Sequence, residues 1–122
     1  MMHGVRTIKY NVNDLAEAKI WYSAVFDQKP YYDKPFYVGF EIEGFELGLV
    51  PADETEPAGP GGVVAYWGVD DINAALARLQ QLGGRLDVAI IDVDDDIKVA
   101  TVLDPSGNVF GIIENPHFKG GK

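Results

Sequence analysis

The stretch Val12-Asn-Asp-Leu-Ala-Glu-Ala18 has a counterpart 57 residues further on, Val69-Asp-Asp-Ile-Asn-Ala-Ala75. Val, Asp and Ala recur at the same places of the two motifs, and Leu is matched by Ile. Each copy follows a run typical of a β-strand, 6–12 or 63–69, and opens a helical pattern. Self-similarity of this kind is the signature of a repeated structural unit. The sequence therefore predicts two related modules.

The ends of the two modules repeat as well. The segment 45–51 parallels 110–116 at a spacing of 65 residues, so the second module has about eight extra residues. Between the modules lies a stretch rich in Pro, Gly and acidic residues, which is typical of a linker. We expect a single domain over 1–122, made of module one (about 1–51), a linker (52–62) and module two (63–122).

A helix is expected after each repeated motif. Asp14 and Asp71, or the polar residue before each, are suited to cap the helix N-terminus. Gly83-Gly84 predicts a left-handed end for the second helix. Apolar residues at helical spacing predict one buried face in each helix: Leu15, Ala18, Tyr22, Val25 and Phe26 in the first, and Ile72, Ala75, Leu76, Leu79 and Leu82 in the second.

Three strands are expected after each helix. In module one they are a short strand around 30–32 and a hairpin of 36–42 and 45–50 that turns at Glu43-Gly44. In module two they are 86–93, 98–103 and 109–113, with turns at 92–96 and 104–108. Each module is thus strand, helix and three strands, which predicts an α+β fold of two tandem βαβββ modules.

Composition narrows the range of partners. The 122 residues include 10 Lys and Arg against 19 Asp and Glu, a net charge of −9, which disfavours nucleic acid and anionic membranes. The absence of Cys excludes disulfides, thiolate nucleophiles and zinc–cysteine sites. No stretch is apolar enough for a signal peptide or a membrane span, so we expect a cytoplasmic protein.

Two segments of these modules resemble a known family. They are Val-Asn-Asp-Leu-Ala-Glu-Ala-Lys-Ile-Trp-Tyr (12–22) and Leu-Asp-Pro-Ser-Gly-Asn-Val-Phe (103–110). Segment 103–110 resembles the DPxGN hairpin of the vicinal oxygen chelate (VOC) superfamily, which includes glyoxalase I, bleomycin-resistance proteins and extradiol dioxygenases. The resemblance covers about 6–116. It implies an open, cup-shaped mixed sheet with the helices outside, a small-molecule ligand in the cup, and a homodimer.

The resemblance also implies where a metal would be held. Counting from the capping Asp and the closing Pro of each module places the family's ligand positions on Thr7, Glu46, Val64 and Gly111. Only Glu46 is a suitable ligand, because Val and Gly offer no donor side chain and a neutral Thr hydroxyl is a poor partner for Zn²⁺, Ni²⁺ or Fe²⁺. Since a divalent site needs at least three protein ligands, we expect no metal site and no cofactor.

Strand alternation predicts the rest of the cup lining. If Thr7 points inward, Lys9 and Asn11 do so too. Lys9 is then expected to neutralise Glu46 or hold an anionic ligand, unless the strand twists it into solvent. The expected ligand-binding residues are Thr7, Lys9, Asn11, Glu46, Tyr66 and Gly111. Glu46 is the best catalytic candidate.

Other polar and aromatic groups receive simpler interpretations. His3 and His117 lie near the chain ends and are not expected to ligate a metal. The acidic run 92–96 is interpreted as a charged hairpin tip, because Ile97 and Leu103 stand where an EF-hand loop needs Gly and Glu. An aromatic cluster is expected either to line a ligand entrance or to form strand core with a subunit contact: Tyr31, Tyr32, Phe36, Tyr37 and Phe40.

Three functions remain open from the sequence. The leading hypothesis is a metal-free protein that binds a small organic molecule in its cup, as bleomycin-resistance members do. The second is a glyoxalase-type lyase or isomerase. It would use Zn, Ni, Fe or Mn held by Glu46 with His3, Glu41 or Glu43, or acid–base chemistry through Glu46 and Lys9 without metal. The third is a non-catalytic protein-interaction module that uses the aromatic strand 36–40.

Overall fold

The structure, a computed structural model, describes residues 2–117. The chain divides into two compact units. The N-terminal unit is Thr7–Val63, and the C-terminal unit combines residues 2–6 with 64–117. The first residues of the chain therefore belong with the second unit, although the sequence assigned them to module one.

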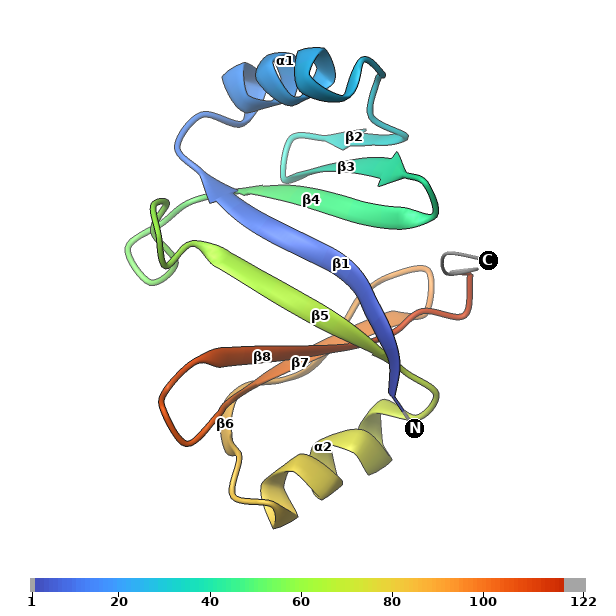
Figure 1. Ribbon diagram of the computed structural model, residues 1–122, viewed down its shortest axis with the longest axis vertical. Coiled ribbons are helices and arrows are strands. Elements are labelled where there is room, and N and C mark those ends of the chain that lie inside the picture. The colour runs from blue at the N-terminus through green and yellow to red at the C-terminus, as the bar shows by residue number, and fades with distance from the viewer. Residues whose placement is uncertain (1, 118–122) are drawn as a thin grey trace. The chain divides into compact units, whose positions relative to one another are not determined.

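The N-terminal unit has the order strand, helix and three strands. Strand β1 spans Met2–Val12, and its part from Thr7 onward belongs to this unit. The other elements are α1 (Leu15–Phe26), β2 (Tyr32–Lys34), β3 (Tyr37–Ile42) and β4 (Phe45–Pro51). Strand β4 runs parallel to β1 and antiparallel to β3, which pairs with β2 on its other side. The strand order in this unit is therefore β2-β3-β4-β1. Helix α1 covers one face of these strands (Figure 1).

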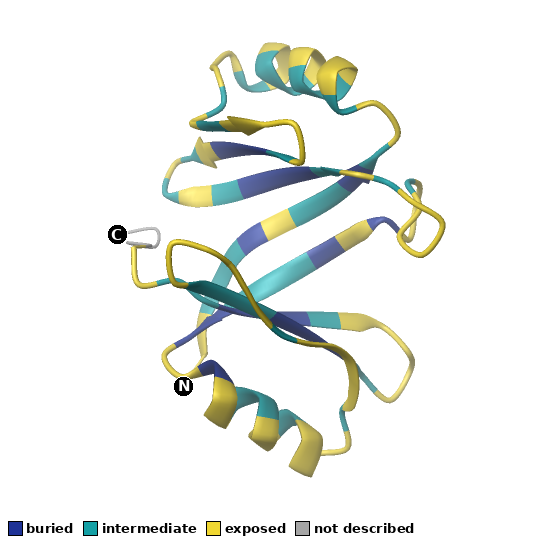
Figure 2. Ribbon diagram, turned by 180° about the vertical axis from the view of Figure 1, so that it is seen from behind, coloured by how far each residue is buried: buried dark blue, intermediate teal, exposed yellow. Residues whose placement is uncertain are grey.

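The core of the N-terminal unit lies between α1 and this face. Val38 and Phe40 of β3 and Leu47 and Leu49 of β4 are buried there, and they appear as dark segments of the two strands in Figure 2. The partly buried residues packed on them include Tyr10, Val12, Leu15, Ala18, Tyr22 and Phe26. The predicted helix face is confirmed with one exception: Val25 is 52% exposed and lies outside this cluster.

The C-terminal unit repeats the order strand, helix and three strands. Its elements are β5 (Val63–Val69), α2 (Ile72–Gln81), β6 (Arg85–Asp94), β7 (Ile97–Leu103) and β8 (Val109–Glu114). Strand β8 runs parallel to β5 and antiparallel to β7, and β7 pairs antiparallel with β6. The order is β5-β8-β7-β6. The predicted α+β class and the βαβββ plan are thus confirmed in both units.

A second core lies between α2 and the strands of the C-terminal unit. Its buried residues are Val69, Ile72, Ala100 and Ile112, with Ala75, Leu76 and Leu79 of the helix packed against them. The prediction was wrong for Leu82, which is 62% exposed. The helix ends there because Leu82 is its C-cap and Gly83 follows with a φ of +98°, a left-handed conformation that glycine adopts at no steric cost.

Both helices begin at the aspartates that the sequence proposed as caps. The Asp14 carboxylate accepts a hydrogen bond from the Glu17 N–H at 3.0 Å, and that of Asp71 accepts one from the Ala74 N–H at 3.1 Å. Each bond satisfies one of the backbone donors that the first helical turn leaves unpaired.

The cap of α2 gives a first testable prediction. We expect Asp71→Ala to lower the free energy of unfolding by about 1 kcal/mol, because the Ala74 N–H loses its acceptor. Asp71→Asn is the control, since Asn caps helices about as well as Asp. Urea denaturation followed by circular dichroism measures both variants. An Asn variant that is as unstable as the Ala variant would contradict the assigned role of the side chain.

The turns follow the predicted residue types, with small shifts at strand ends. Glu43 and Gly44 form the β3–β4 turn, with φ of 52° and 91°. The short strand expected around 30–32 lies at Tyr32–Lys34. The acidic tip is narrower than predicted, because β6 runs through Asp94 and only Asp95 and Asp96 adopt positive φ. In the described part of the chain, no helix is long and apolar enough to cross a bilayer.

Candidate functional site

A carboxylate lies on the face of the N-terminal strands that α1 does not cover. Thr7 on β1 and Glu46 on β4 are register partners of this parallel pair. The Thr7 hydroxyl donates a hydrogen bond of 2.8 Å to Oε1 of Glu46. Thr7 is 6% exposed, whereas Glu46 is half-buried. The structure therefore brings together the two predicted site residues of module one and couples them through a hydrogen bond.

Tyr31 is the second donor to this carboxylate. Its hydroxyl donates to Oε2 of Glu46, and its backbone N–H is anchored on the Gly39 carbonyl at 3.0 Å. Although Tyr31 as a residue is 62% exposed, its hydroxyl end packs against Glu46. Burial of this end, the hydrogen bond to Glu46 and the neighbouring negative charges together raise the pKa of Tyr31 well above its ordinary value.

Tyr31 should therefore titrate late. In the unfolded chain its phenol ionises near pH 10, whereas in the folded chain the raised pKa keeps it protonated at higher pH. The neutral phenol thus stabilises the fold below about pH 10, and this contribution is lost as the pH rises toward the folded-state pKa. Absorbance at 295 nm during alkaline titration should show a late-ionising phenol that Tyr31→Phe removes. An unchanged titration curve in this variant would contradict the contact with Glu46.

Two glycines leave bare backbone beneath the tyrosine rings. Gly39 on β3 and Gly48 on β4 are register partners. A Cβ on Gly39 would lie 2.9 Å from Oε2 of Glu46 and 3.1 Å from Cε1 of Tyr31. A Cβ on Gly48 would lie 2.6 Å from Cζ of Tyr37. The glycines therefore allow the aromatic rings to lie directly on the sheet.

Lys9 and Asn11 of β1 meet the segment 52–62. The Lys9 ammonium forms an ion pair of 2.6 Å with Glu56, and only 13% of its side chain is exposed. Asn11 is 7% exposed and donates through Nδ2 to the Pro57 carbonyl at 3.4 Å. Its Oδ1 is buried without a hydrogen-bond partner among the described residues. The carboxylate beside Lys9 is therefore that of Glu56, a partner that the sequence did not indicate.

Tyr66 and Gly111 form the corresponding pair in the C-terminal unit. They are register partners on β5 and β8, and a Cβ on Gly111 would lie 2.6 Å from Cδ1 of Tyr66. Val64 is buried at 8% exposure and lies two residues before Tyr66 on β5. Strand register thus places Tyr66 opposite Gly111. Counting from the helix caps had instead assigned the family's ligand position on this strand to Val64.

The donor groups at these positions do not fit a divalent metal. Thr7 and Glu46 supply one neutral hydroxyl and one carboxylate, and the hydroxyl donates to the carboxylate. Val64 and Gly111 carry no donor side chain. Between residues 2 and 117, no group of three or more His, Asp or Glu side chains is arranged to hold a metal ion.

The two histidines pair with carboxylates elsewhere. Nε2 of His3 lies 2.7 Å from Oδ1 of Asp70, and Nε2 of His117 lies 3.1 Å from Oδ2 of Asp95. All four groups belong to the C-terminal unit.

Sequence reasoning missed the roles of Tyr31 and Glu56 at this site. Tyr31 was recognised only as a member of an aromatic cluster, and Glu56 only as one acid of the linker. Both lie in loops, where no period of two or 3.6 residues predicts which way a side chain points. The nearest signal in the sequence was that Tyr31 lies shortly before the strand that carries Gly39.

A family model described as Glyoxalase/Bleomycin resistance protein/Dioxygenase superfamily matches residues 4–112. No curated protein matches the sequence. Several solved structures share the fold. A methylmalonyl-CoA epimerase (E43L) from Streptomyces coelicolor in complex with 2-nitronate-propionyl-CoA has a TM-score of 0.78 at 14% identity, over 97% of this chain and 98% of that one.

Two other solved structures also share the fold. A glyoxalase/bleomycin resistance protein/dioxygenase superfamily member from Vibrio splendidus 12B01 has a TM-score of 0.67 at 19% identity, over 93% of this chain and 98% of that one. An NAD-dependent benzaldehyde dehydrogenase from Legionella pneumophila has a TM-score of 0.69 at 17% identity, over 88% of this chain and 96% of that one. At these identities the likeness concerns the fold, which hosts several chemistries.

Proposed function

Because this chain belongs to the glyoxalase/bleomycin resistance/dioxygenase superfamily, we propose that it binds a small organic molecule on the open sheet face of its N-terminal unit, without a metal. Glu46 is the residue that recognises the ligand. Tyr31 and Thr7 position its carboxylate, and the ring of Tyr37 provides an aromatic wall beside it.

The observation that carries this proposal is the fixed orientation of the Glu46 carboxylate. Thr7 donates to one of its oxygens and Tyr31 to the other. An ionised carboxylate has about four acceptor positions, so two remain for a ligand. A carboxylate held in this way is a preorganised acceptor for an N–H or O–H group, and preorganisation reduces the entropy lost on binding.

The surroundings favour a neutral or basic ligand over an anionic one. The protein carries a net charge of −9, and the Lys9 ammonium is already paired with Glu56. The coenzyme A thioester bound by the structurally similar epimerase carries several phosphate charges, for which this face offers no cation besides Lys9 among the side chains described above. The tyrosine rings on bare glycine backbone suit a flat or apolar body instead.

The second candidate function uses the same carboxylate. In a glyoxalase-type lyase or isomerase, Glu46 would accept a proton from a bound substrate. Its support is the hydrogen-bonded position of Glu46 on the open face. The ion pair between Lys9 and Glu56 weakens the version in which Lys9 is the partner acid.

The homodimer and the cytoplasmic location stay predictions. Light scattering tests the homodimer.

Metal titration separates the metal-free proposal from the metal-dependent one. Protein purified without chelator should contain no stoichiometric metal, and calorimetric titration with Zn²⁺ or Ni²⁺ should show no tight site. Tight one-to-one binding that Glu46→Ala abolishes would overturn the proposal in favour of the metal-dependent lyase or isomerase.

A thermal-shift screen tests ligand binding directly, with metal-free bleomycin, small aromatic amines and S-substituted glutathiones as probes. A ligand at ten times its Kd adds about 1.4 kcal/mol of stability, or roughly 4–7 °C in Tm for a domain of this size. Glu46→Gln should weaken binding of the stabilising probe at least tenfold, because a hydrogen bond to a charged group contributes about 1.5–3 kcal/mol. Glu43→Gln, the same change at an exposed turn residue, should not.

The screen also has outcomes that count against the proposal. If no probe stabilises the protein while a protein partner co-purifies in a stable complex, the proposal gives way to the interaction module. If a probe binds equally well to wild type and Glu46→Gln, the assigned carboxylate is wrong. Turnover of a bound probe that Glu46→Gln abolishes would favour the acid–base enzyme.

A further inference from the structure

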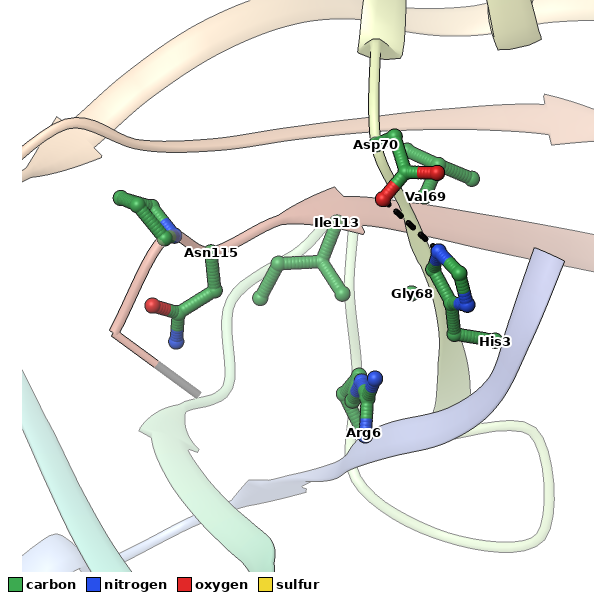
Figure 3. Close-up of a pocket in the computed structure, with 8 residues that line it drawn as sticks. His3, Arg6, Gly68, Val69, Asp70, Ile113 and Asn115 are labelled. Atoms are coloured by element: carbon green, nitrogen blue, oxygen red, sulfur yellow. Dashed lines mark hydrogen bonds and ion pairs between the residues drawn. The ribbon is translucent and has the colours of Figure 1, made fainter. Parts of the chain in front are cut away.

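A polar cavity lies within the C-terminal unit, apart from the residues discussed above as ligand-binding. Its volume is about 280 Å³. Strand β1 contributes His3 and Arg6, β5 and the residue after it contribute Gly68 and Asp70, and β8 with the segment after it contributes Ile113 and Asn115. Figure 3 shows the side chains of His3 and Asp70 meeting on one side of Ile113, with Asn115 on the other.

The negative charge at this cavity is already paired. The Asp70 carboxylate accepts from Nε2 of His3 at 2.7 Å, the contact drawn as a dashed line in Figure 3. This hydrogen bond fixes the orientation of the imidazole ring, so that its other nitrogen, Nδ1, points away from Asp70. Asp70 is thus engaged with a side chain of the cavity itself.

Arg6 supplies a permanent positive charge, and Gly68 makes room for it. A Cβ on Gly68 would lie 2.6 Å from Nε of Arg6 and 2.8 Å from its Cγ. The stem of Arg6 therefore rests directly on the backbone of β5, in a position that any side chain at Gly68 would block. A guanidinium cannot be deprotonated in a protein, and its planar fork binds carboxylates through two parallel hydrogen bonds.

Asn115 adds a second donor beside Arg6. Its side-chain oxygen accepts a hydrogen bond of 2.9 Å from the His117 N–H, so the amide is oriented and its nitrogen is the end available for donation. Ile113, which is 5% exposed, supplies an apolar surface beside these groups. The cavity thus presents the Arg6 guanidinium and the Asn115 amide nitrogen beside an apolar surface.

We propose that this cavity binds the anion of a small monocarboxylic acid. The carboxylate accepts hydrogen bonds from the Arg6 guanidinium and the Asn115 amide, and the apolar part of the acid packs on Ile113. At roughly 30 Å³ per water molecule the cavity corresponds to about nine waters, which suits a molecule of about ten non-hydrogen atoms. This site is independent of the one proposed around Glu46.

Titration of the intact ¹⁵N-labelled protein with sodium benzoate tests this proposal by NMR. We expect saturable binding with a Kd on the order of 1 mM, as a ligand of this size allows. The Gly68 and Ile113 amides and the Asn115 side chain should shift, whereas Gly39 and Gly48 of the N-terminal unit should not. Benzamide, which has the same shape without the charge, should bind at least tenfold more weakly.

Two variants and one control make the test specific. Arg6→Gln should weaken benzoate binding at least tenfold, and Gly68→Ala should weaken it severalfold because the new methyl group displaces the arginine stem. Arg85→Gln removes the same charge from an exposed residue and should have no effect. Equal binding of benzamide and benzoate, equal binding of inorganic phosphate, or unchanged affinity in both cavity variants would overturn the proposal.

Discussion

Phe40→Ala should lower the free energy of unfolding by about 3–5 kcal/mol, the largest effect expected of any substitution considered for this protein. Phe40 is 0% exposed, and its ring lies 6.0 Å from that of Phe26 on α1. Alanine would leave a cavity between β3 and the helix that the close-packed neighbours cannot fill. Because natural domains are stable by only about 5–15 kcal/mol, this loss should also lower the yield of folded protein.

Guanidinium denaturation followed by tryptophan fluorescence measures this loss, because Trp21 lies on α1. Ile20→Ala is the matched control. It also removes a large apolar side chain, but Ile20 is 71% exposed on the same helix, so the change should stay within about 0.5 kcal/mol. A Phe40→Ala variant that is as stable as Ile20→Ala would contradict the core described for the N-terminal unit.

Gly111→Ala should cost about 1–3 kcal/mol through overpacking. The new methyl group would lie 2.6 Å from Cδ1 of Tyr66 and 2.9 Å from the Ala65 carbonyl oxygen. The tyrosine ring can rotate away, but the carbonyl belongs to the backbone of the paired strand β5 and cannot move without disturbing the parallel pair. The variant should therefore be less stable and should also displace Tyr66, which NMR of the tyrosine ring detects.

Gly61→Ala is the control for this substitution. Gly61 is exposed, and a Cβ there meets nothing within 4 Å. Alanine should be neutral at this position or should stabilise the protein by about 0.4–1 kcal/mol, because it restricts the unfolded chain. Thermal denaturation of both variants gives the comparison. If Gly111→Ala were as stable as Gly61→Ala, the close approach of β5 and β8 around Tyr66 would be wrong.

The secondary structure was largely predictable because its signals are local. The two Val-x-Asp motifs identified both helix starts, and Asp14 and Asp71 cap them as expected. The turn at Glu43-Gly44 was equally visible, because few residue pairs adopt positive φ readily. Errors occurred where packing decides. Val25 and Leu82 have helical spacing but point to solvent, since each helix contacts its sheet along a stripe narrower than its apolar sequence pattern.

The sequence predicted the strand face on which the candidate site lies, but not the contacts that its residues make. Alternation along β1 and β4 correctly placed Thr7 and Glu46 opposite the helix-covered core, because a strand sends successive side chains to opposite faces. The pairing of Lys9 was open in the sequence, with Glu46 or an anionic ligand as its expected partner. The structure pairs it with Glu56 instead, because the linker folds back onto the strand and brings the carboxylate of Glu56 to the ammonium.

By itself the sequence determined two βαβββ units, their helix caps, their tight turns and the side chains that share each strand face. All of these depend on neighbours in the chain, through φ preferences, hydrogen bonds three residues apart and the periods of strand and helix. Only the tertiary structure decided that Tyr31 and Thr7 hold the Glu46 carboxylate, that Glu56 neutralises Lys9 and that Arg6 rests on Gly68. These contacts join residues far apart in the chain, whose meeting depends on how loops close and strands register.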